Sequence, residues 1–311
     1  MAKIAVIQTP PTLLDIETTL AGAVRQVDEA AATGAELVVF PETYLPGYPV
    51  WIWRLRPGVD GALSGELYSR LFANAIDLSR GGLEPLQAAA RRNSLTVVCG
   101  LNEREGEFGR GTLYNAVVVI GTDGSILNRH RKLMPTNPER MVWGLGDGSG
   151  LRVVDTPVGR IGTLICWENF MPLARYALYA QGVEIYIAPT YDEGDGWIGT
   201  LQHIAREGRC WVVGCGSALQ ATDIPRDLPR LHELYPEPGA WVNDGDSVVI
   251  APGGSIVEGP LRRAYGTLDA EVDLDRVAAS KRTLDVAGHY ARPDVLELRV
   301  NTCSTRPITI E

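Results

Sequence analysis

One cysteine stands at a point where an expected strand gives way to an expected helix. Residues 160–165 form an apolar, β-branched run that predicts a strand, and Cys166 follows it directly. Met171 and Pro172 then open a stretch with helical spacing, since proline is tolerated in the first turn of a helix. A side chain at such a corner faces a cleft, so Cys166 is a candidate nucleophile. The alternative is a buried structural thiol, because free cysteine is among the most buried residue types.

A nucleophilic thiol needs a basic or cationic neighbour, because its ordinary pKa of about 8.5 leaves it protonated at neutral pH. Glu42 is one candidate, since it ends the apolar strand expected at residues 38–40. In open α/β sheets, functional groups gather beyond the carboxyl ends of the strands. Taken alone, Glu42 is also compatible with a solvated turn.

Lys132 is the second candidate neighbour, and it follows an expected hairpin. Pro135 and Pro138 argue against a helix in the next segment. We therefore expect Lys132 and Glu139 on a fixed loop, with a solvated basic turn as the alternative.

The other cysteines and the histidines form no recognisable ligand pattern. His203 with Cys210 or Cys215 matches no metal-ligand spacing, so the sequence predicts no metal site. The five cysteines include no C-x-x-C pair, which argues against a disulfide framework and against a zinc ribbon. The N-terminal segment lacks the long apolar stretch of a signal peptide. We therefore expect reduced thiols in a cytoplasmic protein.

The bulk properties of the 311-residue chain exclude several classes of partner. Its formal net charge of -9 argues against nucleic acid and against anionic membranes, because both attract basic surfaces. No apolar run approaches the roughly 18 residues that span a bilayer. With 45% hydrophobic and 22% charged residues, the composition is that of an ordinary globular protein.

Short β-branched runs alternate along the chain with stretches at helical spacing, so the fold class is α/β. Two similar segments, which begin at Ala116 and Ser247, each predict a strand, a tight turn and a second strand, and so suggest two related sheets. Helices are expected at residues 18–33, 84–92, 173–180 and 201–207. Surface excursions are expected at residues 58–65 and 222–239.

Three short pieces, taken together and in this order, resemble the nitrilase superfamily of carbon-nitrogen hydrolases. They are F-P-E at residues 40–42, R-K-L at residues 131–133 and C-W-E at residues 166–168. Four longer stretches resemble the nitrile-hydrolysing branch: P-E-R-M-V-W-G-L-G-D-G from Pro138, C-W-E-N-F-M-P-L-A-R-Y-A-L-Y from Cys166, I-A-P-T from Ile187 and G-H-Y-A-R-P-D from Gly288. The resemblance extends from Lys3 to about Val300.

The resemblance implies a fold, a set of catalytic residues and no cofactor. The family fold is a four-layer α-β-β-α sandwich, which fits the expectation of two sheets. Carried over by position, Glu42 is the general base, Lys132 the cationic catalytic residue and Cys166 the nucleophile. Glu139 matches the second glutamate, which supports the lysine. Neither a metal nor an organic cofactor is implied.

The resemblance also implies how the chain is divided and what it assembles with. Residues 1–280 would form the carbon-nitrogen hydrolase domain, and residues 281–311 a C-terminal extension that packs on this domain or on a partner subunit. Related enzymes assemble as dimers and larger spirals, so a homodimer or a larger homo-oligomer is expected.

Nitrile hydrolysis is the reaction that the resemblance implies. Attack of Cys166 on a small nitrile would give a covalent thioimidate, then a thioester, and finally the carboxylic acid and ammonia. Lys132 and the backbone N–H of Trp167 would stabilise the negative charge that develops on the nitrogen. The nearest alternative is an amidase or carbamoylase of the same superfamily, although C-W-E-N and E-R-M-V-W-G favour nitriles. A second alternative is a catalytically idle scaffold protein.

Several residues near these motifs are candidates for the walls of a substrate pocket, with ordinary core packing as the alternative for each. They are Tyr48, Trp51, Trp143, Trp167 and Pro189. His130 is a candidate for positioning the lysine, with a surface histidine as the alternative. Glu168, beside the nucleophile, is expected to be buried and therefore to need a hydrogen-bond donor.

Overall fold

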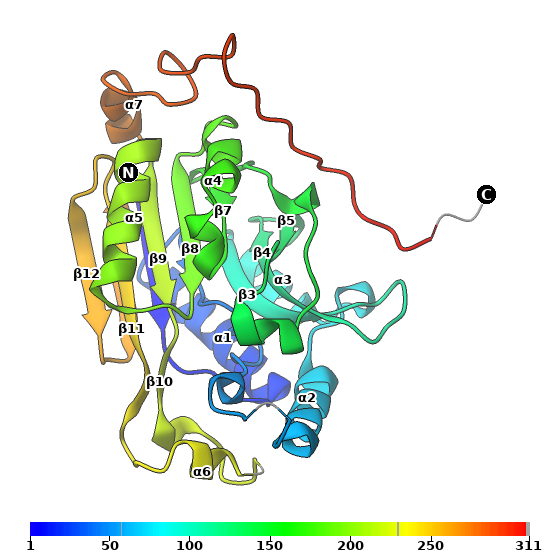
Figure 1. Ribbon diagram of the computed structural model, residues 1–311. Helices are drawn as coiled ribbons and strands as arrows, with labels where there is room; N and C mark the ends of the chain where they lie inside the picture. Colours follow the sequence, from blue (N-terminus) through cyan, green and yellow to red (C-terminus); the bar gives the residue numbers. More distant parts are fainter. Residues whose placement is uncertain (57, 229, 309–311) are drawn as a thin grey trace.

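The structure is a computed structural model that describes residues 1–56, 58–228 and 230–308. Two β-sheets form the middle of the molecule (Figure 1). The first has the order β13-β1-β2-β3-β4-β5, made of β1 (Ala2–Gln8), β2 (Leu37–Val39), β3 (Thr96–Arg104), β4 (Leu113–Ile120), β5 (Ile126–Arg131) and β13 (Gly266–Val272). The second has the order β10-β11-β9-β8-β7-β6, with β12 beside β11. Its strands are β6 (Val154–Thr156), β7 (Gly159–Thr163), β8 (Ile185–Thr190), β9 (Trp211–Gly216), β10 (Ala218–Gln220), β11 (Trp241–Ile250) and β12 (Ile256–Arg262).

The two sheets are built alike, each around a parallel centre. In the first sheet β2 lies parallel to β1 and β3, and in the second β8 lies parallel to β7 and β9. The segments that begin at Ala116 and Ser247 form the hairpins β4–β5 and β11–β12, one in each sheet. The expectation of two related sheets is thereby confirmed.

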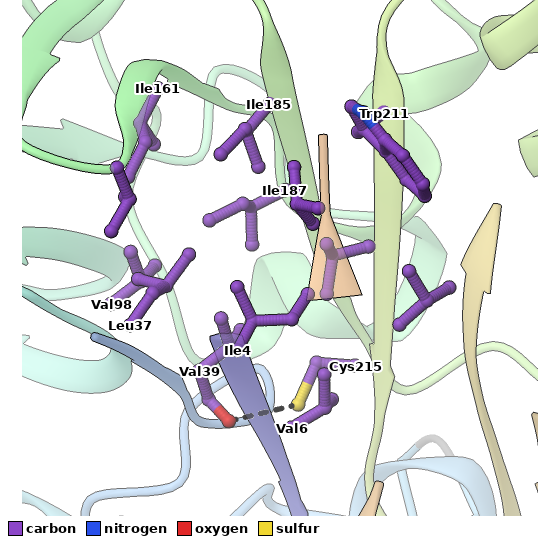
Figure 2. Close-up of a cluster of buried hydrophobic side chains, with 14 of the residues drawn as sticks. Ile4, Val6, Leu37, Val39, Val98, Ile161, Ile185, Ile187, Trp211 and Cys215 are labelled. Carbon is purple, nitrogen blue, oxygen red and sulfur yellow. Dashed lines mark hydrogen bonds between the residues drawn. The ribbon is translucent and has the colours of Figure 1, made fainter. Parts of the chain in front are cut away.

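Aliphatic side chains fill the layer between the two sheets (Figure 2). Ile4, Val39 and Val98 come from the first sheet. They belong to one buried cluster with Ile161 and Ile187 from the second sheet. Because successive side chains of a strand point to opposite faces, the alternate residues of the same strands face outward and need a second cover.

Helices provide that cover on both outer faces. Val27 of α1 and Leu86 of α3 belong to the cluster on the outer face of the first sheet, and Leu178 of α4 and Leu201 of α5 to that of the second. The result is a four-layer α-β-β-α sandwich, which confirms the expected fold. The helices are α1 (Ile16–Ala32), α2 (Gly61–Asn74), α3 (Glu84–Asn93), α4 (Pro172–Tyr179), α5 (Gly194–Gly208), α6 (Leu231–Leu234) and α7 (Asp275–Lys281). Single turns of 3-10 helix are η1 (Val50–Trp53), η2 (Leu78–Arg80), η3 (Asn137–Met141), η4 (Gly148–Gly150), η5 (Cys166–Phe170) and η6 (Ala221–Asp223).

The expected helices α1, α3 and α4 are found within two residues of their predicted ends. Helix α5 begins seven residues before the predicted start at Leu201. Gly194, Gly196 and Gly199 occupy this first part, and glycine is a poor helix former, so the composition concealed the helix.

The two expected surface excursions do lie largely at the surface, but each contains helical residues that bury leucines. Residues 58–65 run into α2, whose Leu63, Leu67 and Leu71 are buried at a spacing of one helical turn. Residues 222–239 contain η6 in part and α6, and they bury Leu228 and Leu231 in the same cluster as α2. Three glycines in the first segment and the prolines in the second concealed helical residues that cover a satellite core.

A glycine-containing loop lies directly against the backbone of β5. A Cβ atom on Gly146 would stand 2.1 Å from the carbonyl oxygen of Arg131, and one on Gly150 would stand 2.5 Å from the Cα of His130. Such distances exclude any side chain at either position. The loop therefore fixes the end of β5 from which Lys132 emerges.

The chain beyond α7 has no helix or strand as far as residue 308. Figure 1 shows this segment running from α7 across the molecule toward the opposite side. Val286 and Ala287 pack against the core of the second sheet, and the N–H of Thr305 donates to Asp147 at 2.7 Å. Among the described residues, no helix combines the length and apolarity needed to cross a membrane.

We predict that Ile187→Ala destabilises the protein by about 2–5 kcal/mol, because it opens a cavity in the layer between the sheets. Chemical denaturation monitored by tryptophan fluorescence measures the effect. Ile256→Ala is the matched control, since Ile256 lies on β12 with 39% of its surface exposed. Equal losses of stability in the two variants would contradict the importance of this inner layer.

Candidate active site

Four polar side chains from distant segments meet in one buried place. Glu42 comes soon after β2, Lys132 directly follows β5, and Cys166 lies just beyond β7. Glu139 lies on η3. The three charged side chains, those of Glu42, Lys132 and Glu139, are at most 1% exposed, and Cys166 is 5% exposed. The structure thus brings together all four residues that the sequence singled out.

Lys132 is held between two carboxylates. Its Nζ donates to Glu42 Oε1 and to Glu139 Oε2, both at 2.8 Å. Burial, the largest influence, lowers the pKa of Lys132, but the nearby charges, those of Glu42 and Glu139 among them, outweigh it and raise the pKa above its ordinary value. The ammonium therefore stays charged at neutral pH although water is excluded from it.

Glu42 keeps one acceptor position free. Its Oε1 accepts from Lys132 and from Asn115 Nδ2 at 2.7 Å, and its Oε2 accepts from the N–H of Tyr191 at 2.6 Å. A carboxylate has about four acceptor positions, so Oε2 can take one more donor. Burial, the largest influence, raises the pKa of Glu42 above its ordinary value, and the charge of Lys132 opposes the rise only in part.

Cys166 begins η5 with a left-handed backbone, at φ 51°. Such a conformation costs a residue with a Cβ on the order of 1 kcal/mol and is found where surrounding contacts impose it. Burial, and after it the charge of Glu42, raises the pKa of the Cys166 thiol well above its ordinary value, while Lys132 opposes this rise. The resting thiol is therefore protonated at neutral pH.

Asn169 fixes the turn that carries Cys166. Its Nδ2 donates to the carbonyl oxygens of Leu164, at 3.1 Å, and of Cys166, at 2.7 Å. Its Oδ1 accepts from the hydroxyl of Tyr186 at 2.6 Å, and the guanidinium of Arg175 donates to its carbonyl oxygen. These buried bonds supply the contacts that the unusual backbone of Cys166 requires.

Glu168 connects the turn that carries Cys166 to the segment that carries Lys132. Its Oε1 accepts from the N–H of Leu133 at 2.6 Å, and its Oε2 accepts from the N–H of Ile165 at 2.7 Å. His130 Nε2 lies 3.0 Å from both oxygens and donates, since an ionised carboxylate can only accept. The residues next to Lys132 and Cys166 are therefore bound to one carboxylate.

The donors around Glu168 also control its charge. Burial, the largest influence, raises the pKa of Glu168, but His130 and the N–H groups of Leu133 and Ile165 outweigh it and leave the pKa below its ordinary value. His130 is fully buried, so of the two alternatives left open for it, the surface histidine is wrong. Glu168 is buried and hydrogen-bonded, as expected.

Glu139 lies in a 3-10 turn and not in the expected loop. Pro138 occupies the first turn of η3, where the missing N–H of a proline is tolerated, and Thr136 caps the turn. Glu139 Oε2 accepts from the N–H of Thr136 at 2.6 Å, and its Oε1 accepts from the hydroxyl of Tyr48 at 2.7 Å. These bonds leave the carboxylate one orientation, toward Lys132.

A cavity of about 230 Å³ opens over Cys166 and Glu139. Tyr48, Trp53, Trp167 and Tyr191 give it aromatic walls, and Asp192 and Glu193 lie at the same cavity. Tyr48 stacks on Tyr191 with the ring centroids 3.8 Å apart. Of the five expected pocket residues, the structure places Tyr48 and Trp167 on this cavity.

The other three expected pocket residues lie in the core and are corrected accordingly. Trp51 is 1% exposed and packs in the satellite core with α2. Trp143 is buried and donates through Nε1 to Asn102 at 2.9 Å. Pro189 lies inside β8 in register with Cys215 of β9. Ordinary core packing, the alternative reading for each, describes these three positions.

The sequence analysis missed several residues of the site, among them Tyr191, Trp53, Asn115 and the cavity carboxylates Asp192 and Glu193. Tyr191 directly follows β8, so the rule that places functional groups at strand ends was a signal for it. Trp53 ends η1, whose tight turn directs it to the cavity while Trp51 points inward. Asn115 lies within β4 and carried no signal in the sequence. In the described part of the chain, no group of three His, Cys, Asp or Glu side chains could hold a metal ion.

Comparisons with known proteins agree with this geometry. A family model described as carbon-nitrogen hydrolase matches residues 3–282. A bifunctional nitrilase/nitrile hydratase from Lupinus angustifolius is 40% identical over 99% of this chain and 88% of its own length. An aliphatic nitrilase from Sinorhizobium fredii (strain HH103) is 39% identical over 96% of this chain and 95% of its own. A carbon-nitrogen hydrolase from Helicobacter pylori G27, at 20% identity, has the same fold, with a TM-score of 0.70 over 94% of this chain and 96% of that chain.

We predict that Glu168→Gln lowers the free energy of unfolding by about 1–3 kcal/mol at pH 7, because an amide cannot accept both backbone N–H groups. The folded pKa of Glu168 is lowered, so its contribution is present above the unfolded pKa of about 4.3 and is lost as the pH falls through the folded value. Chemical denaturation is measured at a series of pH values from 7 to 3. The difference in the free energy of unfolding between wild type and Glu168→Gln should become smaller below about pH 4.

Glu29→Gln is the matched control for this measurement. Glu29 lies exposed on α1, and its side chain makes no hydrogen bond or ion pair with any residue that the structure describes. A difference between wild type and Glu168→Gln that stays constant down to pH 3 would show that the charge of Glu168 does not support the fold.

Proposed function

The chain belongs to the carbon-nitrogen hydrolase family, and on that premise we propose that it is a nitrilase, which hydrolyses a small nitrile to the carboxylic acid and ammonia. The observation that carries the proposal is the buried ammonium of Lys132, held by Glu42 and Glu139 beside the Cys166 thiol. Relatives that bear the name nitrilase, at 39–40% identity over nearly the whole chain, support the nitrile as the substrate.

The first step we propose is coupled proton transfer and attack. Cys166 is a neutral thiol at rest, so its proton must leave as the sulfur attacks the nitrile carbon. Glu42 receives this proton at its free acceptor position, and its raised pKa makes it a better base than an ordinary carboxylate. The proton then passes to the nitrile nitrogen, which gives a neutral thioimidate bound to Cys166.

Stabilisation of the developing negative charge is the role we assign to Lys132. Its ammonium is already fixed by Glu42 and Glu139, so it needs no reorganisation when charge develops on the nitrogen. The N–H of Trp167, at the start of the turn that follows Cys166, is the second donor in this proposal. Glu139 acts through Lys132 and fixes the position of its ammonium.

Two water molecules complete the cycle. Glu42 accepts a proton from the first water as its oxygen adds to the thioimidate carbon. Ammonia leaves with the transferred protons, and a thioester remains on Cys166. The second water adds to the thioester carbon in the same way, the carbon–sulfur bond breaks, and the carboxylic acid and the free thiol result. The scheme requires no metal or organic cofactor.

We predict that Cys166→Ala lowers ammonia release from a nitrile by roughly a thousandfold or more, because the covalent route is lost. Ammonia is measured by a coupled enzymatic assay, and circular dichroism verifies the fold. Cys303→Ala is the matched control, since Cys303 is the exposed thiol of the C-terminal segment, and this variant should keep full activity. Turnover of Cys166→Ala at the wild-type rate would contradict the mechanism, whereas a folded wild-type protein that releases no ammonia would support the idle-scaffold alternative.

An amidase or carbamoylase would use the same residues on a carbon–nitrogen single bond. We expect the wild-type protein to release ammonia faster from a nitrile than from the amide of the same acid. The comparison is made at equal substrate concentration, with the acid quantified by chromatography. A faster reaction with the amide would replace the proposed nitrilase by an amidase.

We also propose that the protein acts in the cytoplasm as a homodimer or a larger homo-oligomer. Five free cysteines, four of them buried, support a reducing compartment. In the C-terminal segment, Tyr290, Val295 and Leu296 are between 63% and 76% exposed. Such apolar exposure supports packing of the extension from residue 281 on a partner subunit.

A further inference from the structure

Two carboxylates at the catalytic cavity lack a cationic partner. Asp192 and Glu193 both line the cavity that contains Cys166. Asp192 accepts from Trp167 Nε1 at 2.8 Å and from the N–H of Glu193 at 2.9 Å, and Glu193 accepts from the N–H of Asp244. All of these donors are neutral. Within residues 1–56, 58–228 and 230–308, neither carboxylate forms an ion pair.

Two arginines near the cavity are already bound to other carboxylates. Arg262 pairs with Asp246 at 2.7 Å and with Asp195 at 2.8 Å. Arg263 pairs with Asp244 at 3.0 Å. Arg54 stacks over the ring of Tyr235, with its guanidinium carbon 5.0 Å from the centroid, and is not among the residues that line the cavity.

The cluster of Glu42, Lys132 and Glu139 has no net positive charge. Lys132 is a single ammonium between the two carboxylates of Glu42 and Glu139. Together with Asp192 and Glu193, the charges around the cavity are therefore predominantly negative. In a space of about 230 Å³, every part of a bound molecule lies close to these charges.

The behaviour of Glu193 agrees with a negative potential at this place. Glu193 is partly exposed, yet the desolvation of its carboxylate is the largest influence and raises its pKa, and the charges of Asp244, Asp246 and Asp192 raise it further. The N–H of Asp244 opposes this rise only in part. A cation bound beside Glu193 would relieve the repulsion among these carboxylates.

The aromatic walls of the cavity point to the same kind of ligand. Tyr48, Trp53, Trp167 and Tyr191 line it, and aromatic faces attract ammonium groups. Aromatic rings combined with unpaired carboxylates form a site for an organic cation. A carboxylate on the substrate would meet repulsion from Asp192 and Glu193 and would find no cation among the described residues that line the cavity.

We propose that the substrates of this enzyme are small nitriles that carry a protonated amino group, which Asp192, Glu193 and the aromatic walls bind while the nitrile reaches Cys166. This inference rests on the proposed nitrile hydrolysis and names its substrate class. The same charges repel the carboxylate product and so favour its release.

Three nitriles with equal chains of methylene groups test the proposal. They are 5-aminopentanenitrile, hexanenitrile and 5-cyanopentanoate, which end in an ammonium, a methyl and a carboxylate group. An uncharged apolar cavity would favour the methyl compound, because an ammonium loses its hydration there. We expect kcat/KM at low ionic strength to be about tenfold higher for the ammonium compound than for hexanenitrile, and lowest for the carboxylate.

Removal of the two charges should abolish the preference. In the double variant Asp192→Asn, Glu193→Gln, we expect the ratio of kcat/KM for 5-aminopentanenitrile to that for hexanenitrile to fall to about one or below. The single variants should give intermediate ratios, and they replace the double variant if it fails to fold. Glu29→Gln, which makes the same chemical change on α1, should keep the wild-type ratio.

The outcomes separate this inference from the reaction on which it rests. A wild-type ratio of one or below, or a ratio that is unchanged in the double variant, would overturn the charge preference while hydrolysis of hexanenitrile still supports the nitrilase. If no nitrile is hydrolysed, the proposed reaction fails instead. Calorimetric titration of Cys166→Ala with the three compounds then tests the preference without turnover, and equal affinities would overturn it.

Discussion

The site depends on one buried ion cluster, the ammonium of Lys132 between the carboxylates of Glu42 and Glu139. Burying these charges is costly, and their mutual attraction compensates only when the geometry is maintained by further bonds. The structure supplies such bonds on each side: Asn115 and Tyr191 hold Glu42, and Thr136 and Tyr48 hold Glu139. The polar interior of this site is thus a set of hydrogen bonds built around the ammonium of Lys132.

Two further constraints bring the thiol to that cation. Glu168 binds the backbone on both sides of the gap, at Leu133 next to Lys132 and at Ile165 next to Cys166. Asn169 then imposes the left-handed backbone of Cys166 by binding its carbonyl oxygen. Neither residue needs to touch a substrate to act. Their contribution is to hold the thiol of Cys166 in a fixed position relative to Lys132. This explains why Cys166, Glu168 and Asn169 occur together in the motif C-W-E-N.

The sequence predicted those parts of the site that depend on strand ends, and it missed those that depend on side-chain direction. Glu42 and Cys166 follow buried apolar strands, so their positions made them candidates, and the resemblance of F-P-E and C-W-E to the carbon-nitrogen hydrolases selected them. Trp51 and Trp53 are two residues apart, and only the turn of η1 decides which of them meets the cavity. The fold class followed from the alternation of strands and helices, whereas α2 escaped because its glycines weaken the helical signal that its leucines provide.

The proposed catalytic residues are divided between the two sheets, since Glu42 and Lys132 extend from the first and Cys166 from the second. A chain in which only one sheet has formed therefore has no enzymatic activity, even if the secondary structure of that sheet is native. Enzymatic turnover therefore requires that the two sheets have packed against each other. The time at which activity returns during refolding measures when the sandwich forms. The first sheet is itself completed by β13, which pairs with β1, so a nascent chain remains inactive until almost all of this domain has been synthesised.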